Sequence, residues 1–268
     1  MLDSVDLSQS LDRETYVRDV ALYQLQLQEL SHQVRAQNRP ALVVFEGPDS
    51  ISADDLILRI TENLDPHTCI VHPIDDPDGI DLAHHHLYRF WRRLPPRGKI
   101  GIFDGSWYRE MLVSRVSGHL SDEGWARALR EINSFERQVA DFGTIVVKFW
   151  LHASLDERLQ QDEGEEGVLY QVWEFPSAVW NSPERREAYQ DAVNEMLFKT
   201  STLSGSWTIV ESDDGWWAEV KTLSTLVETL SWALNYQPRT LRINPVEAEQ
   251  EAPASKKASG KKKKKRKK

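Results

Sequence analysis

Short hydrophobic runs alternate with longer stretches of mixed polarity along most of the chain. The short runs are rich in β-branched residues, which is typical of strands buried on both faces of a sheet. We predict strands at five of these runs: 41–45, 68–72, 98–103, 144–151 and 206–210.

The longer stretches carry hydrophobic residues near every third or fourth position, which is the spacing of amphipathic helices. We predict helices over 11–36, 54–63, 80–94, 122–139, 183–200 and 215–234. Strands that alternate with helices indicate an α/β fold, in which a parallel sheet is covered by helices on both faces.

The first predicted strand leads into a turn and a helix, and this order is the architecture of a phosphate-binding loop. Gly47 and Pro48 form the turn. A working loop of this kind reads G-x-x-x-x-G-K-[ST]. Here the places of its second glycine, its lysine and its small polar residue are held by Ser52, Ala53 and Asp54. The scaffold of the loop is present, but its cation is missing.

Composition excludes several classes of protein. Hydrophobic residues make up 40% of the chain, as in a soluble globular protein, and no run is long enough to cross a membrane. The acidic N-terminus lacks the hydrophobic core of a signal peptide. The single cysteine, Cys69, lies in a hydrophobic run, so we expect a buried, inert thiol. These features favour the reducing cytoplasm.

The net charge of −9 hides two parts of opposite sign. The last 13 residues hold ten basic side chains and no acidic one, which leaves 23 basic against 42 acidic residues in 1–255. We predict a disordered basic tail over 236–268 that is either only solvated or binds polyanions. Its candidate polyanion-binding residues are Lys261, Lys262, Lys263, Lys264, Lys265, Arg266, Lys267 and Lys268.

Three consecutive histidines, His84 to His86, fall within the helix predicted over 80–94. Neighbours on a helix point about 100° apart, so three in a row cannot face one point. The pattern favours a mixed edge between surface and core over a metal site.

Short motifs scattered through residues 12–234 resemble those of the family-2 polyphosphate kinases, which move phosphate between inorganic polyphosphate and nucleotides. The motifs are Phe45-Glu-Gly-x-Asp49, Arg59-Ile-Thr-Glu-x-Leu-x-Pro66, Leu94-Pro95, Phe103-Asp-x-Ser-Trp-Tyr108, Val116-x-Gly118, Phe135-Glu-Arg137, Lys148-Phe-Trp-Leu151, Trp173, Tyr189, Met196-Leu197 and Thr200. The resemblance implies a three-layer α/β/α sandwich of the P-loop kinase type, with a helical lid over about 152–200. It makes 12–235 one domain, preceded by a loose leader over 1–11. Dimers or tetramers are common in the family.

The chain departs from the family where the family performs chemistry. The first motif of the family ends in G-K-G, where this chain has residues 52–54. The second reads F-D-R-S-W-Y-N-R, where this chain has Gly105 and Glu110 in place of the two arginines. The lid lacks its basic cluster, since Gln160, Gln161 and the run Gln171-Val-Trp-Glu174 stand there. Cations are therefore replaced by neutral or acidic groups throughout.

Two carboxylates of the family are kept, and the resemblance implies that they organise Mg²⁺ and the attacking phosphate. These candidate catalytic and metal-binding residues are Asp49 and Asp104, which could equally be a helix cap and a buried hydrogen-bonding group. The candidate phosphate-binding loop consists of Glu46, Gly47, Pro48, Asp49, Ser50, Ile51, Ser52, Ala53 and Asp54. Lys148 also matches the family and could serve a structural ion pair.

Three functions remain open. The first is a protein of this fold with weak or no catalysis, acting as a binding or regulatory subunit in a homo-oligomer or beside an active relative. The second is an active phosphotransferase between polyphosphate and a nucleotide, with Mg²⁺ and with Arg109, Arg115 or the tail supplying positive charge. The third is a scaffold that binds polyanions through its tail.

Overall fold

A parallel five-stranded sheet forms the centre of the molecule. The computed structural model describes residues 2–48, 50–154 and 183–240. The strands lie in the order β2-β3-β1-β4-β5, and all neighbouring pairs are parallel. Their bounds are β1 Ala41–Glu46, β2 Cys69–Pro73, β3 Ile100–Asp104, β4 Ile145–His152 and β5 Trp207–Glu211. The five predicted strands and their parallel arrangement are confirmed.

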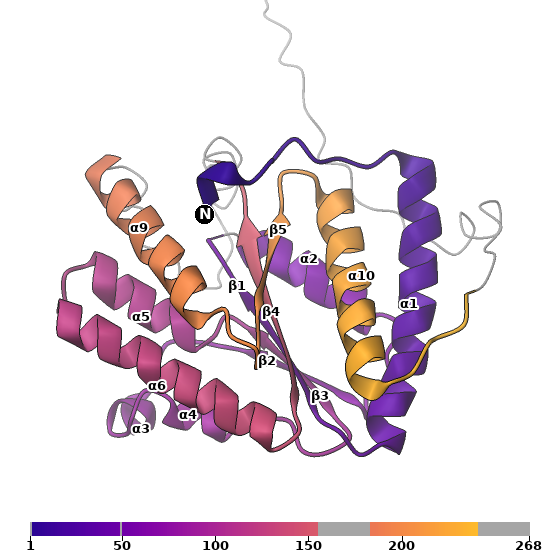
Figure 1. Ribbon diagram of the computed structural model, residues 1–268, viewed down its shortest axis with the longest axis horizontal. Helices are drawn as coiled ribbons and strands as arrows, with labels where there is room; N and C mark the ends of the chain where they lie inside the picture. Colours follow the sequence, from indigo (N-terminus) through magenta and orange to yellow (C-terminus); the bar gives the residue numbers. More distant parts are fainter. Residues whose placement is uncertain (1, 49, 155–182, 241–268) are drawn as a thin grey trace, which may run out of the picture.

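Helices cover both faces of this sheet, so the three-layer α/β/α sandwich is confirmed (Figure 1). One layer consists of α1 Arg13–Ala36, α2 Ser50–Thr61 and α10 Gly215–Leu234. The other layer consists of α3 Gly79–Leu82, α4 Tyr88–Trp91, α5 Trp107–Val116, α6 Asp122–Asp141 and α9 Pro183–Thr200. The short 3₁₀ helix η1, Leu2–Ser4, lies against this second layer.

The central strand β1 shows how the sheet divides its side chains between the two layers. All six of its residues are buried. Val43 and Phe45 belong to the core beneath α1, α2 and α10, and Leu42 and Val44 to the core beneath α5, α6 and α9. Full burial of such side chains contributes about 1.5–3 kcal/mol each. A strand buried on both faces is therefore uniformly hydrophobic, as the sequence shows.

Side-chain caps fix the ends of several helices close to the predicted positions. Asp12 accepts a hydrogen bond from the backbone N–H of Thr15 and begins α1. Asp214 accepts one from the N–H of Trp217 and begins α10, whose predicted span of 215–234 is confirmed. Such caps satisfy N–H groups that have no partner within the helix. They are visible in the sequence because the capping residue is a neighbour of the helix that it starts.

The helix predicted over 80–94 is wrong, because this stretch forms two short helices with a turn between them. Asp78 caps α3, and α3 ends after Leu82. The chain then bends, and α4 begins at Tyr88. Arg89 pairs with Asp81 at 3.5 Å across the bend and also donates to the carbonyl of Asp75. These buried contacts of Arg89 hold the bend, and no local periodicity in the sequence indicates them.

Two other helices differ from their predictions. Helix α2 begins at Ser50, four residues before the predicted start, and α5 was not predicted as a helix. Ser106 caps α5 by accepting from the N–H of Tyr108. The first turns of α5 contain buried Trp107 and Tyr108, so its hydrophobic face is wide and the helical period is hard to see in the sequence.

The leader predicted over 1–11 includes one residue that belongs to the core. Leu2 is buried, and its N–H donates to the side-chain oxygen of Asn194 at 2.9 Å. Most of the predicted lid, 155–182, lies outside the described residues, and α9 supplies its C-terminal part. None of the described helices is long and hydrophobic enough to cross a membrane.

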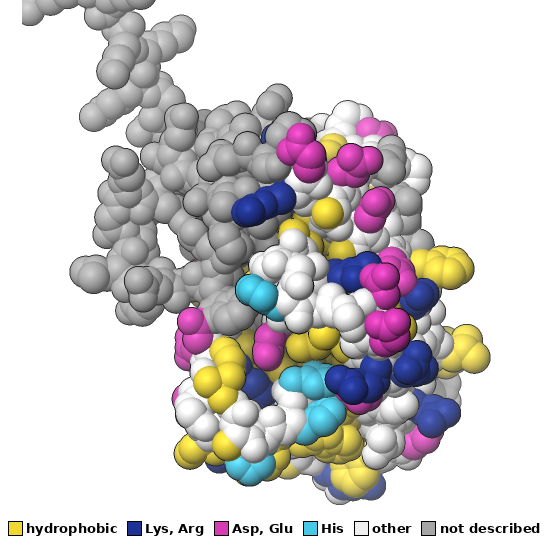
Figure 2. Space-filling model, turned by 90° about the vertical axis from the view of Figure 1, so that its left-hand side faces the viewer, with side chains coloured by type: hydrophobic (Ala, Val, Ile, Leu, Met, Phe, Trp, Pro, Cys, Tyr) yellow, Lys and Arg dark blue, Asp and Glu magenta, His cyan; other side chains and the backbone are white. Residues whose placement is uncertain are grey.

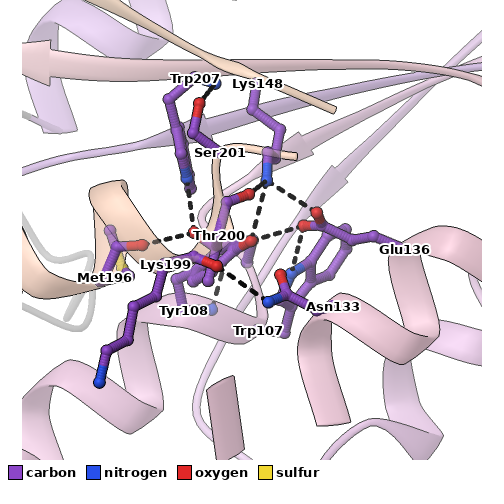
Figure 3. Close-up of polar contacts among 11 residues, drawn as sticks. Trp107, Tyr108, Asn133, Glu136, Lys148, Met196, Lys199, Thr200, Ser201 and Trp207 are labelled. Carbon is purple, nitrogen blue, oxygen red and sulfur yellow. Dashed lines mark hydrogen bonds and ion pairs between the residues drawn. The ribbon is translucent and has the colours of Figure 1, made fainter. Parts of the chain in front are cut away.

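A buried ion pair joins β4 to the helices of the second layer (Figure 3). Lys148 Nζ lies 2.7 Å from Glu136 Oε2, and their side chains are 0% and 1% exposed. The same Nζ donates to the Tyr108 hydroxyl at 3.0 Å and to the Thr200 carbonyl at 2.8 Å. Trp107 and Tyr108 donate to the other oxygen of Glu136. The network therefore ties α5, α6 and the end of α9 to β4, and Lys148 serves a structural ion pair.

Removing one charge of this pair is expected to be costly, because the other is then buried without compensation. We expect Lys148→Met to lower the free energy of unfolding by about 3–5 kcal/mol. The double variant Lys148→Met/Glu136→Gln should lose less than the sum of the two single losses. Urea unfolding of all four proteins measures this coupling. Additive losses would show that the two side chains act independently.

Candidate functional site

The candidate site lies at the carboxyl ends of β1 and β3, where open α/β sheets bind their ligands. The two strands are neighbours, and Phe45 pairs with Asp104 in their register. Glu46 ends β1, and the loop after it leads into α2. Gly47 has a φ of +150°, and a Cβ on it would lie 2.5 Å from the carbonyl oxygen of Leu151. The close approach of β4 therefore requires glycine at this position.

The candidate phosphate-binding loop is described only in part. Asp49 and the side chains of Ser50, Ile51 and Ser52 lie outside the described residues. Ala53 is 4% exposed and belongs to the core between α2 and the sheet. Asp54 is largely exposed near the start of α2, and partial loss of contact with water, together with the neighbouring charge of Asp55, raises its pKa. In the described part of the loop, a methyl group thus occupies the position of the motif's lysine, and a carboxylate follows it at the position of the motif's small polar residue.

Glu46 is the most buried acid of this edge, with 2% of its surface exposed. Its two carboxylate oxygens accept from Ser106 Oγ at 2.7 Å and from Arg109 Nε at 3.4 Å. Burial raises the pKa of Glu46, and the charge of Arg109 opposes that rise. Because Ser106 and Arg109 both belong to the start of α5, Glu46 positions this helix relative to β1.

Asp104 ends β3 beside this pair. Burial raises the pKa of its carboxyl, the positive charge of Arg109 lowers it, and the negative charge of Asp54 raises it again. Glu46, Asp54 and Asp104 therefore share a single edge of the sheet with Arg109. Carboxylate oxygens are the ligands that Mg²⁺ prefers, and a divalent cation would relieve the repulsion between Asp54 and Asp104. Because both oxygens of Glu46 are engaged by Ser106 and Arg109, Asp54 and Asp104 are the described carboxylates that would be left to hold such an ion.

Gly105 makes room for the guanidinium group of Arg109. Its φ is +74°, and a Cβ on it would lie 2.7 Å from Arg109 Cζ. A side chain at this position would therefore push Arg109 away from Glu46. The sequence indicated Arg109 only as a replacement cation, and it did not indicate the contacts of Glu46 with Ser106 and Arg109. The sequence signal that could have indicated these contacts is Gly105, where the family motif has an arginine. A glycine at that position leaves space that Arg109 fills.

Comparisons with known proteins place this fold and these motifs in one family. Residues 10–238 match the family model described as polyphosphate kinase 2. The chain belongs to the polyphosphate kinase 2 family. It is 37% identical over 233 residues to a polyphosphate:AMP phosphotransferase from Pseudomonas syringae pv. tomato, covering 87% of this chain and 47% of that protein. The chain thus spans about half the length of that relative.

Two solved structures of polyphosphate kinase 2 proteins share this fold. The one from Pseudomonas aeruginosa PA01 matches with a TM-score of 0.79 at 36% identity, over 88% of this chain and 51% of that chain. The one from Arthrobacter aurescens TC1 matches with a TM-score of 0.79 over 93% of this chain and 91% of that chain. Its identity is 22%, so the second likeness bears on the fold alone.

Arg109, Arg115 and the basic tail were expected to replace the cations that the polyphosphate kinase 2 motifs contain. Arg115 pairs with Asp122 at 2.5 Å. The basic tail, with Lys261 to Lys268, lies outside the described residues, as do Gln160, Gln161 and the run 171–174 of the lid. Among the described replacement candidates, only Arg109 lies at the carboxyl edge of β1 and β3, and Glu46 binds it.

Cys69 begins β2 and is separate from this edge. Its side chain is partly buried, and burial raises the pKa of the thiol to about 11. The thiolate is the reactive form of cysteine, so this thiol is protonated and unreactive near neutral pH. The inert thiol that the sequence predicted is therefore consistent with its surroundings, although the side chain is less buried than expected.

Substituting Gly105 should displace Arg109 as well as strain the backbone. We expect Gly118→Ala to cost about 1–2 kcal/mol, because Gly118 has the same φ of +74° but no atom within 4 Å of an added Cβ. Gly105→Ala should cost measurably more, since it also breaks the contact of Arg109 with Glu46. Urea unfolding of both variants separates the two effects. Equal losses would show that Arg109 moves aside without cost.

Proposed function

We propose that this chain is a polyphosphate kinase 2 family protein with weak or absent phosphoryl transfer, which acts as a binding or regulatory subunit. The observation that carries the proposal is the charge at the carboxyl edge of β1 and β3. Glu46, Asp54 and Asp104 lie there, and Arg109 is engaged by Glu46. Where the family motifs carry a loop lysine and an arginine, a polyphosphate chain approaching this edge would meet Ala53 and Gly105, beside an Arg109 that Glu46 already binds.

The energetic argument rests on what phosphoryl transfer demands. The transferring phosphoryl group gains little from covalent chemistry with the protein and depends on positioning and on neutralisation of its charge. Loss of a single preorganised electrostatic contact typically costs about 10²–10³ in rate. Ala53 replaces the family's loop lysine with a buried methyl group, and Gly105 replaces an arginine. Two such losses already reduce the expected rate by several powers of ten.

The names of related proteins support a proposal for the ligand of this chain. Its relatives are named for polyphosphate with AMP, ADP or GDP, so we propose polyphosphate or a nucleotide as the ligand of this chain. We further propose one domain over 12–235, a homo-oligomer or a complex with an active relative, and the cytoplasm as location. We propose that any retained phosphate contact is made at the start of α2, because the first N–H groups of a helix have no partner within it and attract anions.

Weak transfer is testable against a named relative. We expect this chain to form ADP from AMP and polyphosphate, with Mg²⁺, at less than about one hundredth of the rate of the Pseudomonas syringae phosphotransferase. The loss of the loop lysine is the physical reason. The variant Asp104→Asn gives the background rate of ADP formation in this assay. A wild-type rate above that background and within tenfold of the relative would overturn the proposal.

A second function, an active phosphotransferase that uses Mg²⁺, is favoured by one specific observation. Asp104 is partly buried, and its pKa is raised chiefly by this burial and to a smaller degree by the negative charge of Asp54, against the opposing charge of Arg109. Paired carboxylates of this kind suit a divalent cation, which would bridge phosphate oxygens and neutralise developing charge. Asp104 and Asp54 would hold the ion, together with Asp49 of the loop.

This cation site predicts a pH-dependent effect of Asp104→Asn. Because the pKa of Asp104 is raised in the folded state, its ionisation opposes folding. The wild type should lose stability as pH rises from the unfolded pKa of about 4 through the folded pKa. Asp104→Asn removes this loss, so the variant should melt at a higher temperature than the wild type at pH 8 and at the same temperature near pH 3.

Magnesium should act in the same measurement. At pH 8, Mg²⁺ should raise the melting temperature of the wild type by binding the folded state and should leave Asp104→Asn unchanged. The exposed Asp141 at the end of α6 offers a matched control, and Asp141→Asn should respond to Mg²⁺ as the wild type does. An equal response of Asp104→Asn and the wild type would place the bound Mg²⁺ elsewhere.

A further inference from the structure

The turn between α3 and α4 brings two of the three consecutive histidines together. The argument that adjacent histidines cannot face one point assumed a continuous helix, and residues 83–87 are not helical. The ring centroids of His85 and His86 lie 4.2 Å apart with their planes inclined by 31°. Both rings point toward Glu131 on α6. Irregular backbone thus allows an arrangement that a helix forbids.

The distances among these three side chains are close to those of a metal centre. Glu131 Oε2 lies 3.5 Å from His85 Nε2 and 3.9 Å from His86 Nε2, and one potential ligand atom from each residue lies within 4.8 Å of the others. A tetrahedral ion with bonds of about 2.0–2.2 Å separates its ligand atoms by about 3.3–3.6 Å. Small movements of the rings would therefore complete the triangle.

We propose that His85, His86 and Glu131 form a binding site for Zn²⁺, separate from the phosphate-binding edge. Two imidazole nitrogens and one carboxylate are a common ligand set for zinc with three protein ligands. Imidazole selects transition metals over Mg²⁺, which prefers oxygen ligands and octahedral geometry. The metal would fasten the α3–α4 turn to α6.

The buried nitrogen of His86 supports this site. His86 Nε2 is enclosed by the protein and makes no hydrogen bond among the described residues. A buried polar atom without a partner carries a free-energy cost that a metal ion would remove. Glu131 is also contacted by Arg127 at 3.7 Å, but Arg127 is 69% exposed and can turn toward water.

His85 requires one rearrangement. Its Nδ1 accepts a 3.3 Å hydrogen bond from the N–H of Leu87, which places the ring proton on Nε2. Zinc at Nε2 would displace that proton to Nδ1 and break this long hydrogen bond. The free energy lost with this hydrogen bond is small compared with that gained from a metal–nitrogen bond. Zinc binding therefore requires a local change in the turn.

An adjoining hollow leaves room for a fourth ligand. Its volume is about 320 Å³, and its lining includes His85, Glu131, Trp91 and Phe135. Arg127 and Arg130 also line it and would favour water or a small anion at the metal. Figure 2 shows histidine side chains beside basic ones on the face of the molecule to which α6 belongs.

The first histidine of the run provides a matched control. His84 stacks on Tyr88 with ring centroids 4.1 Å apart, and its Nδ1 lies 2.7 Å from the carbonyl of Ile80. It is engaged away from Glu131, although it adjoins His85 in the sequence. His84→Ala therefore removes one histidine from the run and leaves the proposed ligands in place.

The test is calorimetric titration of the full chain, free of any histidine tag, with Zn²⁺, and a parallel absorbance titration with Co²⁺. We expect one Zn²⁺ per chain and a tetrahedral Co²⁺ spectrum for the wild type and His84→Ala. His86→Ala and Glu131→Gln should each weaken binding by at least about 10–100-fold, because even an outer partner of a ligand contributes that much. Zn²⁺ should also raise the melting temperature of the wild type.

Three results of the titrations would contradict the zinc site. If the wild type binds no Zn²⁺, or if all four proteins bind it alike, the proposal is wrong. A greater loss of Zn²⁺ affinity in His84→Ala than in His86→Ala would show that the metal binds elsewhere in the run His84 to His86, and the proposal would be wrong. Circular dichroism checks the fold of each variant, and Glu131→Gln decides alone if His86→Ala does not fold, since glutamine preserves the size of the side chain.

Discussion

The ion pair between Lys148 and Glu136 is the constraint on which the second helical layer depends. Two opposite charges without access to water are stable only if each remains paired and hydrogen-bonded. The Thr200 carbonyl and the Tyr108 hydroxyl complete the surroundings of Lys148, so α9 and α5 are bound to the same point on β4. The position of α5 in turn places Ser106 and Arg109 at the end of β1. The buried ion pair thereby helps to place Ser106 and Arg109 at the carboxyl edge of β1 and β3.

At that edge, the fold of the polyphosphate kinase 2 family is kept, and the charged side chains depend on a few local residues. The sheet, the glycine at the turn and the acids that end two strands are present, and the structural likeness to a family member extends over most of the chain. In this chain Gly105 leaves space at the edge, and Arg109 occupies that space and pairs with Glu46. A fold is maintained by its core, whereas transfer of phosphate depends on a few charges outside it. Likeness of fold is therefore a weaker guide to rate than the identity of these few residues.

The histidine pair at the α3–α4 turn illustrates a different relation between backbone and chemistry. Arg89 holds the bend, and the bend directs His85 and His86 toward the same carboxylate on α6. This arrangement lies outside the candidate phosphate-binding loop and shares no residue with it. A metal there would act on the stability of the turn, whereas Mg²⁺ at Asp104 would act on phosphate.

The sequence by itself determined the strands, most helix bounds and the fold class, because periodicity and caps are local. Asp214 and the hydrophobic pattern after it define α10 without reference to any distant residue. Only the tertiary structure decided the strand order, the pairing of Glu46 with Arg109, the burial of Lys148 and the meeting of His86 with Glu131. These partners are separated by many residues, and a contact between distant residues leaves no period in the sequence. Long-range contacts arise when the layers pack, so the chemistry at each site was decided by packing.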